Sequence, residues 1–249
     1  MKATPLQLRW ICLASAMLAL CGCVPSPTPV ALSGHANTNT SVVRAADVSD
    51  DPPSLRVASV ERAARGMTVR VRSLGCQHLG TASAVAVGPR LLVTNRHVVE
   101  GTTTLELNFW DGTSARAQLE SVSVADDLAL VQVSTRLPAV ATLVTGDVAQ
   151  GSRVLVAGYP NGGRQAVSNG ALIEYAPLEG QPDATPVMRL SITIEPGNSG
   201  GPVLNHAGDV VGVVFGVETA TGYGLAVPAS AVERLMEGDG SRSASAVCS

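Results

Sequence analysis

The chain has 249 residues, of which 45% are apolar, 3% aromatic and 15% charged, and its formal net charge is −3. This length suffices for a substantial core, and the slightly acidic balance argues against a nucleic-acid-binding surface. Short apolar runs rich in valine and threonine, bounded by glycine and proline, predict an all-β barrel or sandwich rather than a helical bundle.

Residues 1–23 are predicted to be an export signal. Lys2 and Arg9 flank an apolar segment, residues 10–20, which is too short to span a membrane permanently. The segment ends in the letters LCGC, which resemble a bacterial lipobox in which Cys23 becomes the lipidated N-terminus. We therefore expect a lipid anchor at the outer face of the cytoplasmic membrane, with plain secretion as the alternative.

Residues 24–65 are predicted to form a disordered tether. The segment is rich in proline, serine and threonine, has few large apolar side chains and shows no sustained period. Such a composition cannot bury enough apolar surface to fold by itself. We expect it to hold the folded domain, residues 66–249, away from the membrane.

The first half of that domain carries two motifs at the ends of predicted strands. The letters TNRHVV place His97 directly after the apolar run 91–93, and DDLALV places Asp127 directly before the strand 128–133. Asp126 is expected to point to the opposite face of the strand. A hairpin is predicted around Asp111 and Gly112, between strands at 104–110 and 114–122.

In the second half, the motif PGNSGGP surrounds Ser199 with glycines. This permits a sharp turn in which the N–H groups of Gly197 and Ser199 converge, so the loop Gly197-Asn198-Ser199 is a candidate oxyanion hole. Apolar runs at 153–160, 165–175, 186–194, 203–204, 210–217 and 223–227 predict strands, and residues 228–237 predict a helix.

Taken together, His97, Asp127 and Ser199 are the set required for nucleophilic catalysis by a serine. Each motif alone is a weak signal, because a lone histidine is often structural and a glycine-rich turn often serves only the backbone. Their combination at strand edges, in the order His, Asp, Ser, indicates a hydrolase.

The three motifs resemble those of trypsin-like serine proteases of the chymotrypsin fold, over residues 66–236. Their spacing is similar to that of the compact bacterial branch that contains the HtrA-type proteases. Residues 212–216, with Cys76 and Cys248, look most like the periplasmic MarP-type acid-resistance proteases of mycobacteria. No PDZ module is expected after Ser199.

This resemblance implies two six-stranded antiparallel β-barrels with a C-terminal helix. Barrel one would span about 66–134, barrel two about 150–228, and the helix and tail 228–249. It also implies a serine endopeptidase that forms an acyl-enzyme with protein or peptide substrates, without a cofactor or metal, in envelope stress or protein processing.

The resemblance further assigns substrate-binding roles. Thr193 would lie at the base of the specificity pocket, and because it is not a carboxylate, an apolar or small side chain is expected there rather than Lys or Arg. The strand expected to pair with the substrate backbone consists of Val213, Val214 and Phe215. Asn198 replaces the aspartate of the digestive enzymes, so activation by a newly cut N-terminal amine is not expected.

Two cysteines, Cys76 and Cys248, remain once the signal is removed. In an oxidising compartment we expect a disulfide between them, with unpaired thiols or an intermolecular bond as the alternative. Two other functions also stay open: an exported esterase with the same triad, and a catalytically idle protease-like binding protein.

Overall fold

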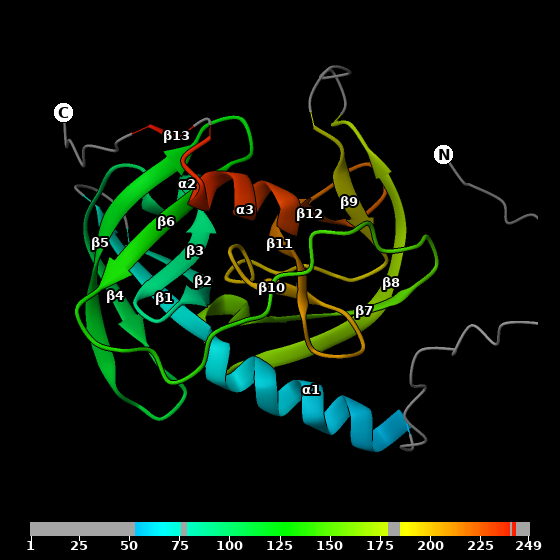
Figure 1. Cartoon of the computed structure of the whole chain (residues 1–249), viewed down its shortest axis with the longest axis horizontal. Helices are drawn as coiled ribbons and strands as arrows, with labels where there is room; N and C mark the ends of the chain where they lie inside the picture. The colour runs from blue at the N-terminus through cyan, green and yellow to red at the C-terminus, as the bar shows by residue number, and fades with distance from the viewer. Residues whose placement is uncertain (1–52, 76–78, 179–184, 240, 243–249) are drawn as a thin grey trace, which may run out of the picture. The chain divides into compact units, whose positions relative to one another are not determined.

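Two six-stranded β-barrels lie side by side in the folded part of the chain, with a helix near each end of it (Figure 1). The computed structural model describes residues 53–75, 79–178, 185–239 and 241–242, all within one unit of the chain. The predicted fold class is confirmed. In the described ranges, no helix is long and apolar enough to cross a membrane.

Barrel one is built from the first six strands. These are β1 (Thr68–Gly75), β2 (Leu79–Gly88), β3 (Leu91–Asn95), β4 (Thr102–Asn108), β5 (Ser114–Ser123) and β6 (Leu128–Val133). The strands follow the order β5-β4-β1-β2-β3-β6, and pairing of β5 with β6 closes the barrel. Val69 and Val71 of β1 are each 1% exposed, whereas Arg70 between them is half-buried, as the two-residue period of a strand requires.

Barrel two is built from the next six strands. These are β7 (Arg153–Gly158), β8 (Ala166–Ala176), β9 (Val187–Leu190), β10 (Pro202–Leu204), β11 (Val210–Val217) and β12 (Gly224–Pro228). They close in the order β10-β11-β12-β9-β8-β7. Two short helical turns lie outside the strands: α2 (Arg96–Val99) after β3, and the 3₁₀ turn η1 (Pro160–Gly162) after β7.

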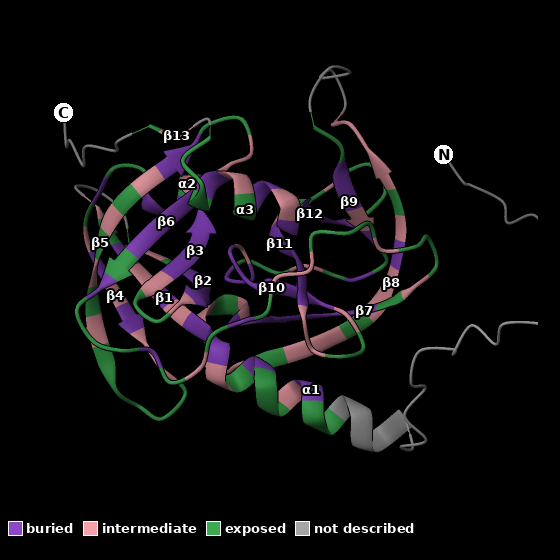
Figure 2. Ribbon diagram, viewed as in Figure 1, coloured by how far each residue is buried: buried purple, intermediate pink, exposed green. Residues whose placement is uncertain are grey.

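Three apolar clusters hold the barrels together. One lies within barrel one and one within barrel two. The third joins the barrels, because it contains Val93 of barrel one, Val213 of barrel two and Val232 of helix α3 (Ala229–Met236). Figure 2 shows the corresponding buried residues on the strands and on α3, while the turns are largely exposed. The relative position of the barrels is therefore fixed by a shared core.

Helix α1 (Pro53–Met67) corrects the expected tether, because residues 53–65 are helical rather than disordered. Val60, Ala64 and Met67 are 3%, 0% and 4% exposed and belong to the cluster that joins the barrels. Their spacing places them on one face of a helix. The sequence gave little sign of this, since the stripe is narrow and its neighbours are polar or small. The signal, Cys23 and the rest of the tether lie outside the described residues.

The C-terminal part returns to barrel one. Val232 and Leu235 of α3 are buried as expected, but Met236, expected on the same face, is 41% exposed. After α3, the short strand β13 (Ser241–Arg242) pairs with β5 opposite Ser123 and Val122, which the sequence did not predict. Cys76 and Cys248 lie outside the described residues.

Candidate active site

His97 and Asp127 are joined by two hydrogen bonds. His97 lies in α2, directly after strand β3, and Asp127 lies directly before β6, which pairs with β3. The imidazole Nδ1 is 2.6 Å from Asp127 Oδ2, and the His97 backbone N–H donates to Oδ1 at 3.1 Å. A carboxylate on Nδ1 favours the tautomer that carries its hydrogen there, which leaves Nε2 as a proton acceptor.

The backbone of Asp127 is held in an unusual conformation. Its φ is +52°, in the left-handed region that non-glycine residues rarely adopt. The conformation is held by two donors to its carbonyl oxygen: the Arg96 N–H at 2.9 Å and Asn95 Nδ2 at 3.2 Å. Asp126 instead contacts Ser123 Oγ and Arg234 Nη2, so only the second of the two acids reaches the histidine.

The loop around Ser199 presents two backbone N–H groups without an acceptor. Gly197 has φ +99°, and the Asn198 N–H donates to Glu195 O at 3.0 Å. Within the described part of the chain, neither the Gly197 N–H nor the Ser199 N–H makes a hydrogen bond. Two of the three residues of the candidate oxyanion hole therefore have N–H groups available to a ligand, and Asn198 does not.

The Ser199 hydroxyl does not point at the histidine. Ser199 Oγ donates to the Phe215 carbonyl oxygen at 3.4 Å, and no hydrogen bond joins it to His97. Rotation about its Cα–Cβ bond is the smallest change that turns the hydroxyl away from Phe215. Staggered rotamers of an exposed serine interchange readily.

Ser83 of β2, which the sequence analysis missed, anchors the Ser199 loop to barrel one. Its N–H donates to Ser199 O at 2.8 Å, and its hydroxyl donates to Gly197 O at 2.7 Å and accepts from the Tyr159 N–H at 3.0 Å. Ser83 is fully buried. A lone serine inside the apolar run ASAVAV was the available signal, because buried hydroxyls require partners.

The turn η1 supports the same loop from the other side. The Asn161 N–H donates to Pro196 O at 2.6 Å, and Asn161 Nδ2 donates to Glu195 Oε2 at 2.7 Å. Asn161 is the second described non-glycine residue with a positive φ, +52°. The segment before Ser199 is therefore held between β2 and η1.

The proposed substrate-pairing strand needs adjustment. Val213 and Val214 are fully buried, and Val214 already bonds through its N–H to Gly201 O and through its carbonyl to the Gly200 N–H. Phe215 lies at an irregularity of β11, where the register with β12 shifts. The accessible edge therefore begins at Phe215, and Val217 is 45% exposed.

Thr193 is exposed in the segment between β9 and Ser199, and no hydrogen bond is formed by its side chain among the described residues. Across the same described ranges, no group of three or more His, Cys, Asp or Glu could hold a metal ion. The arrangement therefore offers a histidine–carboxylate pair, a serine hydroxyl and free amides for chemistry.

Two barrels with these side chains at their junction define the class of trypsin-like peptidases. A family profile described as "Trypsin-like peptidase domain" matches residues 82–213, more than half of the chain. The chain therefore belongs to this family.

Among its relatives are HtrA-type serine proteases. The Do-like serine protease HtrA of Bacillus subtilis (strain 168) is 31% identical over 163 residues, covering 60% of this chain and 36% of that protein. The serine protease Rv3671c of Mycobacterium tuberculosis (strain H37Rv) is 30% identical over 190 residues, covering 72% and 48%. The chain thus spans between about a third and a half of the length of these relatives.

Solved structures agree. The active form of the Rv3671c protease from M. tuberculosis has a TM-score of 0.69 at 25% identity, covering 87% of this chain and 97% of that one. The HtrA-type protease AlgW with a tripeptide has a TM-score of 0.67 at 25% identity, covering 72% and 62%.

Proposed function

We propose that this chain is an exported serine endopeptidase that cleaves protein or peptide substrates through an acyl-enzyme on Ser199. The observation that carries the proposal is the pair of hydrogen bonds from His97 to one Asp127 carboxylate, beside a loop with two free N–H groups. The relatives that are named serine proteases support the same chemistry.

In the proposed reaction, His97 Nε2 removes the proton of Ser199 Oγ while the oxygen attacks the scissile carbonyl carbon. Asp127 keeps the ring oriented and stabilises the imidazolium. The C–N bond then breaks, and the departing amine takes the proton from His97, which leaves an ester on Ser199. Water, activated by the same histidine, hydrolyses that ester. No cofactor or metal takes part.

The negative charge that develops on the substrate oxygen would be stabilised by the N–H groups of Gly197 and Ser199. Donors fixed before the reaction lower the barrier because no reorganisation is needed when the charge appears. The contacts of Ser83 and Asn161 with this loop hold the donors in place.

The substrate backbone would add to the free edge of β11 from Phe215 to Val217. In this orientation the Phe215 carbonyl releases Ser199 Oγ and accepts from the substrate instead. Thr193 offers no charge to the pocket, so we propose small or apolar residues before the cleaved bond.

A fluorophosphonate probe tests the proposal, because it modifies only a serine made nucleophilic by its surroundings. We expect labelling of the full chain and none of the Ser199→Ala variant. Lack of labelling across the pH range would favour an idle binding protein. Cleavage of peptide libraries, compared with hydrolysis of short esters, then separates an endopeptidase from an esterase.

Export and anchoring form a second part of the proposal. A DegP-like relative from Halomonas elongata, 30% identical over 132 residues, is named a periplasmic serine endoprotease, which supports a role in the cell envelope. We propose lipidation of Cys23, which mass spectrometry of the mature N-terminus tests, with Cys23→Ser as the control.

We also propose a disulfide between Cys76 and Cys248. The described ends next to them, Gly75 of β1 and Arg242 of β13, both belong to the sheet of barrel one. The intact mass of unreduced, alkylated protein tests this, because two free thiols would both take up the reagent.

A further inference from the structure

A cavity of about 410 Å³ lies away from the proposed active site. It is formed where the end of α1, strand β1, the end of β4 and the segment after η1 meet, and its walls include three arginines and three aromatic residues: Arg65, Arg70, Arg164, Phe109, Trp110 and Tyr159. His97, Asp127 and Ser199 do not line it. Its size is within the range of natural ligand sites.

The cavity is strongly cationic. No Asp or Glu lines it. Arg65 and Arg164 are exposed, and neither forms a hydrogen bond or ion pair with any residue that the structure describes. Clustered guanidinium groups repel one another and bind carboxylates through paired hydrogen bonds. The walls are therefore complementary to an anion.

Arg70 gives the cavity a fixed cationic floor. Its Nη1 donates to Gly162 O at 3.0 Å and its Nη2 to Asn108 Oδ1 at 3.2 Å. Its guanidinium carbon lies 6.0 Å from the centre of the Tyr159 ring. Arg70 Nε is buried and has no partner. A buried donor without an acceptor is costly unless a ligand or water completes it.

Aromatic surface accompanies this charge. Trp110, which follows β4, is 59% exposed, an unusual position for a large apolar side chain. Phe109 beside it is half-buried. Exposed indoles are frequent where proteins bind partners, because they add contact area at little cost in conformational entropy.

The cavity also offers an acceptor for a peptide backbone. Gln165 Nε2 donates to Ala64 O at 3.3 Å and to Thr68 O at 3.4 Å. Among the described contacts, Gln165 Oε1 has no donor. An inorganic anion would use the arginines but neither the aromatic walls nor this carbonyl, and a lipid surface would suit a flat basic face rather than a recess.

We propose that this cavity binds an acidic peptide segment that carries carboxylates beside an aromatic side chain. The carboxylates pair with Arg65 and Arg164, the aromatic side chain packs on Trp110, and a backbone N–H donates to Gln165. The inference goes beyond the proposed hydrolysis, and binding does not require Ser199.

The chain supplies its own optical probe, because Trp10 and Trp110 are its two tryptophans. We would use the full chain with Trp10→Phe and Ser199→Ala, which leaves Trp110 as the emitter and prevents turnover. The ligand is the blocked peptide acetyl-Asp-Phe-Asp-Glu-amide. Its matched control, acetyl-Asn-Phe-Asn-Gln-amide, keeps the ring and removes the charge.

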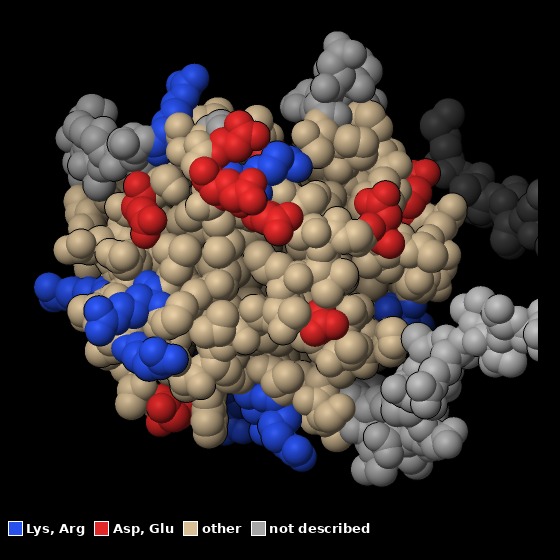
Figure 3. Space-filling view, viewed as in Figure 1, with Lys and Arg blue, Asp and Glu red and all other residues tan. Residues whose placement is uncertain are grey.

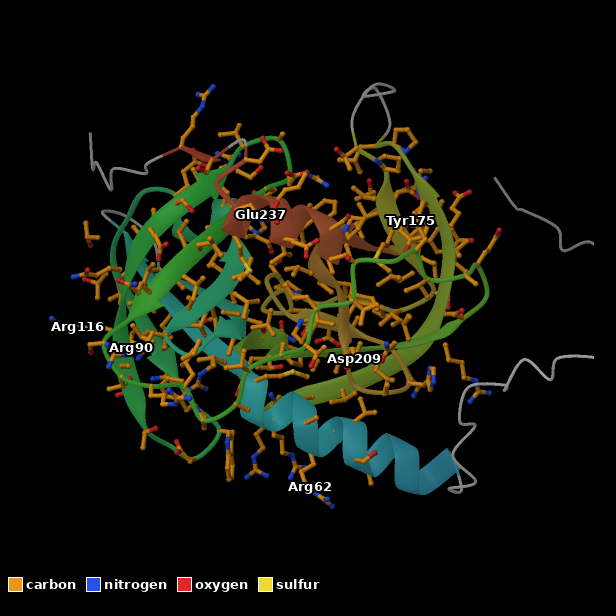
Figure 4. All side chains as sticks on the ribbon, viewed as in Figure 1. Arg62, Arg90, Arg116, Tyr175, Asp209 and Glu237 are labelled. Atoms are coloured by element: carbon orange, nitrogen blue, oxygen red, sulfur yellow. The ribbon has the colours of Figure 1, made fainter. Side chains whose placement is uncertain are left out.

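We expect a saturable change of Trp110 emission with the acidic peptide and none with the control. Arg164→Gln and Arg65→Gln should each weaken binding by about tenfold, the loss expected for one charge-assisted pair. Arg62→Gln is the matched control, because Arg62 lies on the same helix but outside the cavity, projecting from α1 in Figure 4. Unchanged circular dichroism checks the folding of each variant.

Three outcomes would overturn the proposal. The first is an equal response to the uncharged peptide, and the second is an equal loss in Arg62→Gln and Arg164→Gln, which would show unspecific attraction. The third is an equal or stronger response to inorganic phosphate or to phosphatidylglycerol vesicles, which would assign the cavity to a phosphate or a membrane.

Discussion

The Ser83 N–H donates a hydrogen bond to the carbonyl oxygen of Ser199, at 2.8 Å, and so ties a strand of barrel one to the loop of barrel two. Because the two residues come from different barrels, the position of the proposed nucleophile depends on how the barrels pack. A buried side chain far away in sequence thereby becomes part of the support of the site.

We predict that Ser83→Ala impairs both folding and turnover. The change leaves Gly197 O and the Tyr159 N–H unpaired, which should lower the free energy of unfolding by about 2 to 4 kcal/mol. Loss of the anchor should also lower kcat/KM by about tenfold or more, since small displacements of donors are costly. Urea denaturation and peptide hydrolysis measure the two effects. Ser73→Ala, at another buried serine of barrel one, should leave kcat/KM unchanged.

The two neighbouring acids provide a matched pair. Asp127→Asn should reduce kcat by about 10⁴-fold with little change in KM, because an amide favours the wrong tautomer of His97. Asp126→Asn should keep kcat, since Asp126 contacts only Ser123 and Arg234. Steady-state kinetics on one peptide substrate compare them. Equal losses in both variants would remove Asp127 from the proposed triad.

Gly200 cannot accept a side chain. It has φ +84°, and a Cβ atom there would collide with the Ser83 carbonyl oxygen. We predict that Gly200→Ala lowers the free energy of unfolding by more than about 3 kcal/mol. Gly112, at φ +86° in the β4–β5 hairpin, has no neighbour within 4 Å of such an atom. Gly112→Ala should therefore cost only about 1 to 2 kcal/mol of strain, a difference that thermal unfolding resolves.

The packing of α1 can be tested in the same way. Val60→Ala removes two buried methyl groups from the cluster that joins the barrels and should cost about 1.5 to 3 kcal/mol. Arg62→Ala on the exposed face should change stability by less than about 0.5 kcal/mol. If chemical denaturation gives the same small value for both, α1 does not contribute to the core in solution.

The turn after β11 should be sensitive to acid. The pKa of Glu218 is held below its ordinary value, first by the hydrogen bond from Thr221 Oγ1 and then by that from Arg189. A lowered pKa stabilises the folded state above the ordinary value, and this contribution is lost as the pH falls through the folded-state pKa. NMR titration should show a higher Glu218 pKa in Thr221→Val than in Thr221→Ser, which keeps the hydroxyl. Identical midpoints would contradict the assignment.

Local patterns explain why so much of the fold could be predicted. Alternation in β1 and the Asp-Gly hairpin are encoded by neighbouring residues, and the motifs around His97 and Ser199 lie at strand ends. The roles of Ser83 and Asn161 could not be predicted, because each depends on a partner more than 30 residues away. The shift of the substrate edge to Phe215 depends on a break in register with β12, which β11 alone does not reveal.

Charge is unevenly distributed over the surface. On the face shown in Figure 3, acidic side chains gather around α3, while basic ones gather over barrel one and beneath α1. Figure 4 labels Arg90 and Arg116 on barrel one and Glu237 at the end of α3. Since Lys2 is the only lysine of the chain, these basic groups are all arginines. A modest overall charge therefore hides a surface with two distinct poles.

The apolar stripe of α1 also bears on how the protein can be shortened. A recombinant fragment that begins at residue 66 would lack Val60 and Ala64 and would bare the trough that they fill across both barrels. Uncovered apolar surface of this kind promotes self-association. A fragment that begins at residue 53 should stay monodisperse in size-exclusion chromatography, whereas the shorter one should elute as larger species.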